Sequence, residues 1–175
     1  MVLIRKHYQE SDTKRVLVEI LNSLMAGCNQ KPVFICIGSD RHILDCLGPL
    51  TGSMIKEKEP QAIVFGTLDN PVHAKNIGQA IINVKSTYPG RIHIAIDASV
   101  GNEVALGTIT VQKGAIIPGR ALAKSLPPVG DIAITGIVGP KFSRRSNQIF
   151  HGSLNHVYHM AAVISDSISQ WYNRA

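Results

Sequence analysis

The chain has 175 residues, a formal net charge of +6 and a pI near 9.4, with 45% hydrophobic and 17% charged residues. This balance predicts one globular domain, 1–175, with a substantial core, and it excludes wholesale disorder. The apolar run 1–4 is too short for a signal peptide, and no stretch approaches the roughly 18 residues that span a bilayer. We therefore expect a cytoplasmic protein without a membrane partner.

An edge segment and a helix precede the first buried strand. Residues 1–10 read as a short leader or edge segment, and Ser11 or Asp12 can cap a helix that ends near Met25. The uncharged, largely β-branched run 33–38 then predicts a strand buried on both faces of a parallel sheet.

A polar loop and a second helix follow this strand. The loop 39–42 begins after Gly38 and leads to Asp45, and helical spacing of apolar residues predicts a helix from there to about Glu59. Because open α/β sheets place ligands where strands give way to loops, Asp45 is a candidate site residue.

Two further strand signals lead to a second aspartate. The pattern predicts a short strand at 62–65, a helix at 72–87 and a strand at 92–96 that ends directly on Asp97. This alternation of strand and helix favours a parallel sheet with helices on both faces. If the strands are neighbours, their carboxyl ends bring Asp97 to the same rim as Asp45.

The last third of the chain changes character. Residues 107–113 alternate and predict a strand that is antiparallel or at an edge. The stretch 114–130 is rich in Gly and Pro and predicts a functional loop with at most one helical turn, at 121–124. A buried strand at 131–138 and a long helix at about 147–172 complete the domain.

The fold class that these elements predict is α/β, with a mainly parallel central sheet between layers of helices. The strands expected at its centre lie at 33–38, 62–65, 92–96 and 131–138.

Four segments, at 37–50, 66–76, 96–98 and 126–131, together resemble the YyaC-type sporulation proteins, small bacterial relatives of the germination protease. The resemblance covers roughly residues 30–165. It implies a three-layer α/β/α sandwich of the phosphorylase/hydrolase-like kind, shared with hydrogenase maturation peptidases. It also implies a place in the sporulating cell or spore.

The resemblance carries two residue roles. The segment from Asp45 to Pro49 is similar to Asp-Ala-Leu-Gly-Pro of the germination protease, whose aspartate is considered catalytic. The segment 96–98 is similar to its Ile-Asp-Ala, which makes Asp97 the second essential aspartate. The protease has a histidine before a Pro-Gly pair where this chain has Ile117, so metal-centred recognition is not carried over.

Two neighbouring carboxylates suit peptide hydrolysis on chemical grounds. Like charges close together do not both ionise easily, so the pair can share one proton. We expect a helix dipole to hold Asp45 ionised as the base, and burial to keep Asp97 protonated as the acid. The alternative is that Asp45 is only a helix N-cap and Asp97 only caps a loop.

Around the pair we expect a shallow cleft walled by residues 39–42, 66–73, 99–101 and 118–124. The candidate substrate contacts are Asp40, Arg41, His42, Thr67, His73, Ser99, Gly101 and Lys124. Asp40 and Arg41 could instead form a local ion pair. Either His42 or His73 could replace the missing histidine, or both could be plain surface, and Lys124 could be solvated.

No cofactor and no tightly bound zinc are expected. Only His156 and His159 share a helix face, without a carboxylate beside them, and Cys28, Cys36 and Cys46 lack metal-ligand spacing. A weakly held divalent ion between the two aspartates is compatible with the sequence. Cys46 could be an activated thiol, although its carboxylate neighbour opposes this.

The expected function is a sporulation-associated peptidase that acts on a protein or peptide, and a homo-oligomer is compatible with the sequence. One alternative is a non-catalytic protein that binds a protein partner on the same fold. Another is a nucleic-acid-associated protein, but the basic residues are scattered and only 5% of the residues are aromatic. Nucleic acid is therefore not an expected partner.

Overall fold

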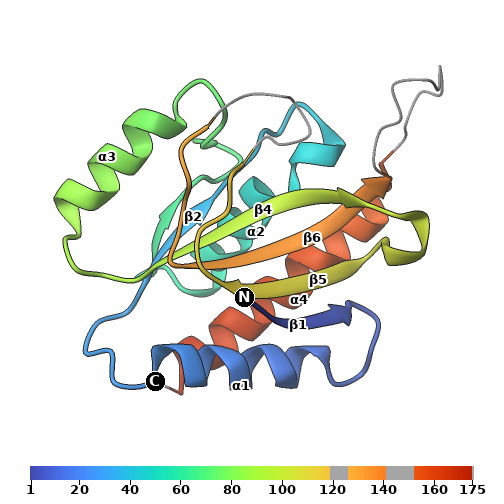
Figure 1. Ribbon diagram of the computed structural model, residues 1–175, viewed down its shortest axis with the longest axis horizontal. Helices are drawn as coiled ribbons and strands as arrows, with labels where there is room; N and C mark the ends of the chain where they lie inside the picture. Colours follow the sequence, from blue (N-terminus) through green and yellow to red (C-terminus); the bar gives the residue numbers. More distant parts are fainter. Residues whose placement is uncertain (119–125, 141–151, 175) are drawn as a thin grey trace.

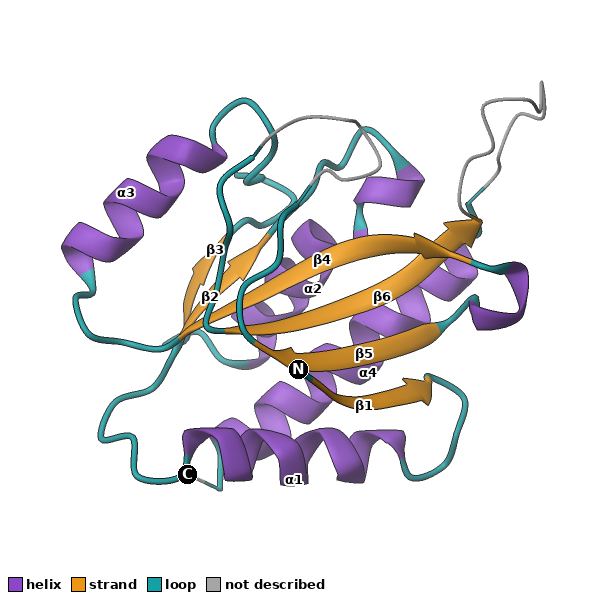
Figure 2. Ribbon diagram, in the orientation of Figure 1, coloured by secondary structure: helices purple, strands orange, loops and turns teal. Residues whose placement is uncertain are grey.

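The computed structural model describes residues 1–118, 126–140 and 152–174. A six-stranded sheet in the order β1-β5-β6-β4-β2-β3 forms its middle layer, and helices cover both faces (Figures 1 and 2). The predicted α/β/α sandwich is therefore confirmed. The strands are β1 (Val2–His7), β2 (Val33–Cys36), β3 (Ile63–Phe65), β4 (His93–Gly101), β5 (Thr108–Lys113) and β6 (Ile132–Pro140).

The described helices are four α-helices and two short 3-10 helices. They are α1 (Thr13–Met25), η1 (Ile43–Asp45), α2 (Leu47–Lys58), α3 (Ile77–Thr87), η2 (Glu103–Ala105) and α4 (Leu154–Tyr172). None of them is long and apolar enough to cross a membrane.

The sheet has a parallel half and an antiparallel half. Strands β3, β2, β4 and β6 are parallel neighbours, whereas β5 runs antiparallel to β6 and β1 antiparallel to β5. The expected antiparallel pairing of the strand at 107–113 is confirmed, and β5 lies inside the sheet because β1 pairs with its outer side and forms the edge. The prediction of a central β3 is wrong, because β3 pairs with β2 at the other edge of the sheet.

The alternating side chains of β2 reach both helical layers, as expected for a strand buried on two faces. Phe34 and Cys36 pack in the core shared with α1, α2 and α4, while Val33 and Ile35 pack in the smaller core under α3. Among the described α-helices, α3 therefore covers one face of the sheet, and α1, α2 and α4 cover the other (Figure 1).

Strand β4 is longer than predicted. It continues through Asp97 to Gly101, because residues 94–101 pair in parallel with β6 from Ile132 to Pro140. The expectation that the strand ends on Asp97 is therefore wrong.

Two helix starts and one helix cap also differ from the prediction. Helix α3 begins at Ile77 and not at Val72, because Val72 pairs with Ile37 in an isolated parallel bridge. Asp12 stands at the start of α1 but makes no side-chain cap; its carboxylate pairs with Lys6 instead. Helix α4 begins at Leu154. Residues 147–151, the predicted turn at 121–124 and Lys124 lie outside the described residues.

Candidate active site

Asp45 lies where the strand order of the sheet reverses. The chain leaves β2 toward β3 on one side and returns later to β4 on the other side of β2. Open α/β sheets bind ligands at such a point, beyond the carboxyl ends of the strands. Asp45 is the last residue of η1, in the loop after β2, and therefore lies at the position where such sheets bind ligands.

A short backbone bond closes the loop around Asp45. The Ser39 N–H donates to the Asp45 carbonyl over 2.9 Å, and the Asp45 N–H donates to the His42 carbonyl over 2.9 Å. The turn needs glycine at residue 38, whose φ is +140° and whose Cβ would lie 1.9 Å from the Asp45 carbonyl oxygen.

Asp97 lies in β4 one residue beyond the point where β2 stops. The last β2 residue, Cys36, stands opposite Ile96, so Asp97 has its ladder partner, Thr135, only on the β6 side. Its side chain is almost wholly buried, with 8% exposure for the residue. The Ala98 N–H donates to its Oδ1 over 2.8 Å.

Burial and the charge of Asp45 raise the pKa of Asp97 to about 8. Burial disfavours the charged form, and a second carboxylate nearby disfavours it further. The Ala98 hydrogen bond acts in the opposite direction and is outweighed. Asp97 is therefore mostly protonated at neutral pH, the state predicted for it, and its carboxyl is electrostatically coupled to that of Asp45.

Burial also raises the pKa of Asp45, against the effects of His42, His73 and the Ser39 N–H, which lower it. Desolvation is the largest of these effects, so the pKa of Asp45 is not lowered as the sequence analysis expected. Burial, Asp40 and Asp45 likewise raise the pKa of Cys46, so its thiol is not activated.

A cleft of about 520 Å³ opens beside Asp45. It is formed by the loop after β2 and the loop between β3 and α3, and its lining residues are Ser39, Asp40, Arg41, Asp45, Leu68, Asp69, Pro71, His73, Ala74 and Lys75. Asp97 is not among them. The cleft therefore reaches one aspartate directly, whereas the other is almost wholly buried and is not part of the lining.

Three of the predicted substrate contacts line this cleft: Asp40, Arg41 and His73. Within the described residues, Asp40 and Arg41 form no ion pair with each other, so that alternative is wrong. His42 lies beside Asp45 and lowers its pKa but does not line the cleft.

Three other predicted contacts, Thr67, Ser99 and Gly101, are not part of this lining. The Thr67 hydroxyl accepts the Asn70 N–H and so closes its own turn, and Ser99 and Gly101 belong to β4. A Cβ on Gly101 would meet the Ile137 side chain at 3.0 Å, so this glycine accommodates β6. Lys124 lies outside the described residues. The sequence analysis missed Ala74 and Lys75, because it placed them inside a helix.

Within the described part of the chain, no group of three or more His, Cys, Asp or Glu side chains could hold a metal ion. His156 and His159 instead both contact Tyr8. The His156 Nδ1 lies 3.1 Å from the Tyr8 hydroxyl, and the His159 ring stacks on the Tyr8 ring at 5.8 Å between centroids.

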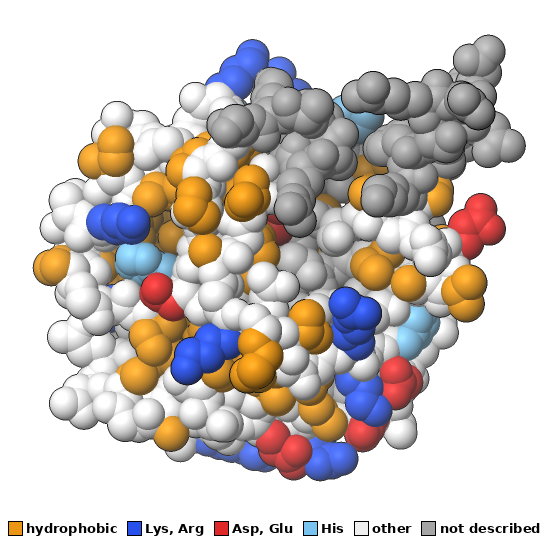
Figure 3. Space-filling view, viewed as in Figure 1, with side chains coloured by type: hydrophobic (Ala, Val, Ile, Leu, Met, Phe, Trp, Pro, Cys, Tyr) orange, Lys and Arg blue, Asp and Glu red, His pale blue; other side chains and the backbone are white. Residues whose placement is uncertain are grey.

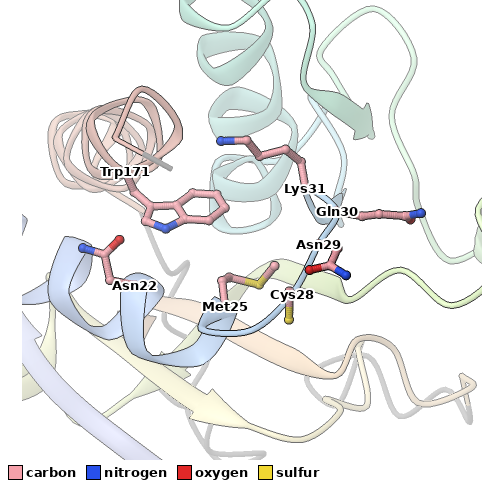
Figure 4. Close-up of a pocket in the computed structure, with 7 residues that line it drawn as sticks. All are labelled: Asn22, Met25, Cys28, Asn29, Gln30, Lys31 and Trp171. Carbon is pink, nitrogen blue, oxygen red and sulfur yellow. The ribbon is translucent and has the colours of Figure 1, made fainter.

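A second, smaller hollow of about 320 Å³ lies between α1, the segment after it and the end of α4 (Figure 4). Its lining residues are Asn22, Met25, Cys28, Asn29, Gln30, Lys31 and Trp171. The Lys31 ammonium lies 4.3 Å from the Tyr172 ring centroid and donates to the Tyr172 carbonyl over 2.8 Å. This lysine therefore ties the segment before β2 to the end of α4, and the described lining of the hollow contains no carboxylate.

Comparison with known proteins agrees with the extent of this fold. Residues 5–167 match the family model described as "Protein of unknown function (DUF1256)". The chain belongs to this family. It is also similar to the "Uncharacterized protein YyaC" of Bacillus subtilis (strain 168), with 32% identity over 164 residues, which cover 93% of this chain and 80% of the relative. Both Asp45 and Asp97 of this chain lie within the residues that match the family model.

Proposed function

We propose that this DUF1256 protein is a peptidase in which Asp45 and Asp97 together activate water against a peptide bond. The observation that carries the proposal is the electrostatic coupling of a buried, protonated aspartate to a second aspartate that lines a cleft. Strongly shifted carboxyl groups in a cleft are typical of acid–base sites. The similarity of the two aspartate segments to the germination protease supports the same activity, and also a role in sporulation.

In the proposed reaction, ionised Asp45 takes a proton from water while the water oxygen bonds to the peptide carbonyl carbon. Protonated Asp97 donates a hydrogen bond to the carbonyl oxygen as charge develops on it. The C–N bond then breaks, and Asp45 returns the proton to the leaving amine. The cleft walls at Asp40, Arg41 and His73 are the proposed contacts for the peptide.

A second candidate function is the binding of a protein partner without catalysis. It is favoured by one observation: Asp97 is almost wholly buried and does not line the cleft, so access of water to it is restricted. A binding protein would use the cleft walls and would not need both carboxyl groups.

The test is hydrolysis of a synthetic peptide library, with new N-termini identified by mass spectrometry, for the wild type, Asp45→Asn and Asp97→Asn. We expect each variant to lose activity by about 10²–10⁴-fold, the usual contribution of one acid or base. Glu103→Gln, which changes an exposed carboxylate in η2, is the matched control. Circular dichroism checks that all variants are folded.

Wild-type activity in either aspartate variant contradicts the peptidase proposal. So does a wild type that cleaves no peptide, and binding of library peptides by both aspartate variants would then favour the second candidate.

A further inference from the structure

Among the described residues, His73 is the one histidine that lines the cleft together with Asp45. The residue before it is attached to the end of β2: the Gly38 N–H donates to the Val72 carbonyl over 2.8 Å, and Val72 pairs with Ile37. His73 is therefore held against the same strand end from which the loop to Asp45 departs.

The backbone of His73 is fixed on its other side by the start of α3. Its N–H donates to the Asn76 Oδ1 over 2.8 Å, and its carbonyl accepts the N–H groups of Asn76 and Ile77 at 3.0 and 2.9 Å. The Asn76 amide also donates to the Pro71 carbonyl over 3.0 Å. These bonds hold the backbone on both sides of the histidine, so its position does not depend on contacts with a substrate.

One further bond favours one tautomer of the neutral ring. The Lys75 N–H donates to the His73 Nδ1 over 3.3 Å. A ring nitrogen that accepts a hydrogen bond carries no proton, so the neutral ring has its proton on Nε2. His73 therefore presents an N–H donor and has no free lone pair with which to accept a proton.

The ring also lies close enough to Asp45 that its protonated form, present at lower pH, lowers the pKa of that carboxyl. His42 acts on Asp45 in the same direction but does not line the cleft. The two histidines thus share an electrostatic effect and differ in their access to a substrate.

We propose that neutral His73 donates a hydrogen bond from its Nε2–H to the carbonyl oxygen of the scissile bond and stabilises the negative charge that develops there. The proposal rests on the peptidase function proposed above. His73 neither gains nor loses a proton: the water proton still passes to Asp45 and then to the leaving amine. Asp97 and His73 would be the two donors to one oxygen, as in an oxyanion hole.

The test compares three changes at His73 in the full chain with a cleaved library peptide. His73→Ala removes the donor, and we expect kcat to fall by about 10²–10³-fold with little change in KM. His73→Asn places its amide near Nδ1 and should behave like alanine. His73→Gln can place an N–H near Nε2 and should recover part of the lost kcat.

His42→Gln is the matched control for the electrostatic effect on Asp45. We expect it to shift the pH dependence of kcat without the loss of the plateau rate seen in His73→Ala. Equal losses of the plateau rate in His42→Gln and His73→Ala overturn the proposal, and so does an effect of His73→Ala on KM alone.

The ring itself can be observed without a substrate. Long-range ¹⁵N–¹H spectra of the wild type above pH 7 should show His73 as the Nε2–H tautomer. An Nδ1–H tautomer in an active enzyme overturns the role of His73 alone. An Nε2–H tautomer in a protein that cleaves no peptide overturns the peptidase function, and the catalytic role of His73 with it.

Discussion

Asp45 and Asp97 carry the same carboxyl group in two different surroundings. Asp97 is buried in a strand and coupled to a second carboxylate, so the pKa of its carboxyl is raised to about 8. That direction could be predicted from the apolar run that precedes it. The raised pKa of Asp45 could not, because it follows from desolvation inside a loop whose closure through Ser39 is a tertiary feature.

The raised pKa of Asp97 predicts a pH-dependent stability. In the unfolded chain this carboxyl has a pKa near 3.9, so between about pH 4 and pH 8 the folded state binds more protons. Folded-state stability therefore falls as the pH rises through this window. Asp97→Asn removes the cost of ionising this carboxyl. We therefore expect the unfolding free energy of the variant, relative to that of the wild type, to be about 2–4 kcal/mol higher at pH 9 than at pH 5.

Urea unfolding of both proteins at the two pH values measures this gain. An equal pH dependence of the wild type and of Asp97→Asn is the contrary result, because it means that Asp97 is ionised at little cost in the folded state.

At the scale of elements, helix α2 packs unusually close to the sheet through two glycines one turn apart. A Cβ on Gly48 would lie 2.0 Å from the Ile37 carbonyl oxygen, and one on Gly52 would lie 2.1 Å from the Gly66 carbonyl oxygen. Gly66 in turn has a φ of +93° and no room for a Cβ beside the Cys36 carbonyl. This glycine therefore accommodates the backbone of the neighbouring strand β2.

This packing predicts opposite effects for two Gly→Ala changes in helices. Gly52→Ala forces α2 away from a backbone oxygen that cannot move aside, and we expect a loss of about 1–3 kcal/mol of stability. Gly78→Ala in α3 meets nothing within 4 Å, and the better helix former should add about 0.5–1 kcal/mol. Thermal unfolding ranks the variants, and Gly52→Ala at or above wild-type stability would show that the contact is loose.

The length of β4 shows where sequence patterns fail at this scale. Asp97 and Ser99 interrupt the apolar run, and a polar residue after such a run ordinarily marks the end of a strand. Here the strand continues because β6 offers an equally long parallel partner. A pairing between segments about 40 residues apart leaves no local signal in either one.

At the scale of the whole molecule, the order of strands and helices could be predicted, because the continuous apolar runs and helical spacings are strong. The position of each strand within the sheet could not be predicted. The N-terminal strand β1 pairs with β5, more than 100 residues later, and this pairing moves the parallel strands off-centre. The loop between β3 and α3 could not be predicted either, because it also depends on pairing between distant segments. The bridge from Val72 to Ile37 replaces the expected first helical turn.

The charge distribution predicts weak binding to nucleic acid. On the face drawn in Figure 3, the basic and acidic side chains of the described residues are interspersed. Several basic residues, including Lys6, Lys14, Arg15 and Lys58, are also paired with carboxylates. We expect a 20-base-pair duplex to bind no tighter than about 10⁻⁶ M at physiological salt. Fluorescence anisotropy measures this, and tighter binding that weakens steeply with salt would restore the nucleic-acid alternative.

The measurement that bears most directly on the site is the titration of Asp97, followed by ¹³C NMR of its carboxyl carbon in the wild type and in Asp45→Asn. It needs no substrate. We expect a pKa of about 8 in the wild type. In Asp45→Asn we expect a lower value that is still above the ordinary range, because burial remains and the neighbouring charge is lost. An Asp97 that titrates near 4 in the wild type, or whose titration is unaffected by Asp45→Asn, would contradict a coupled pair of aspartates.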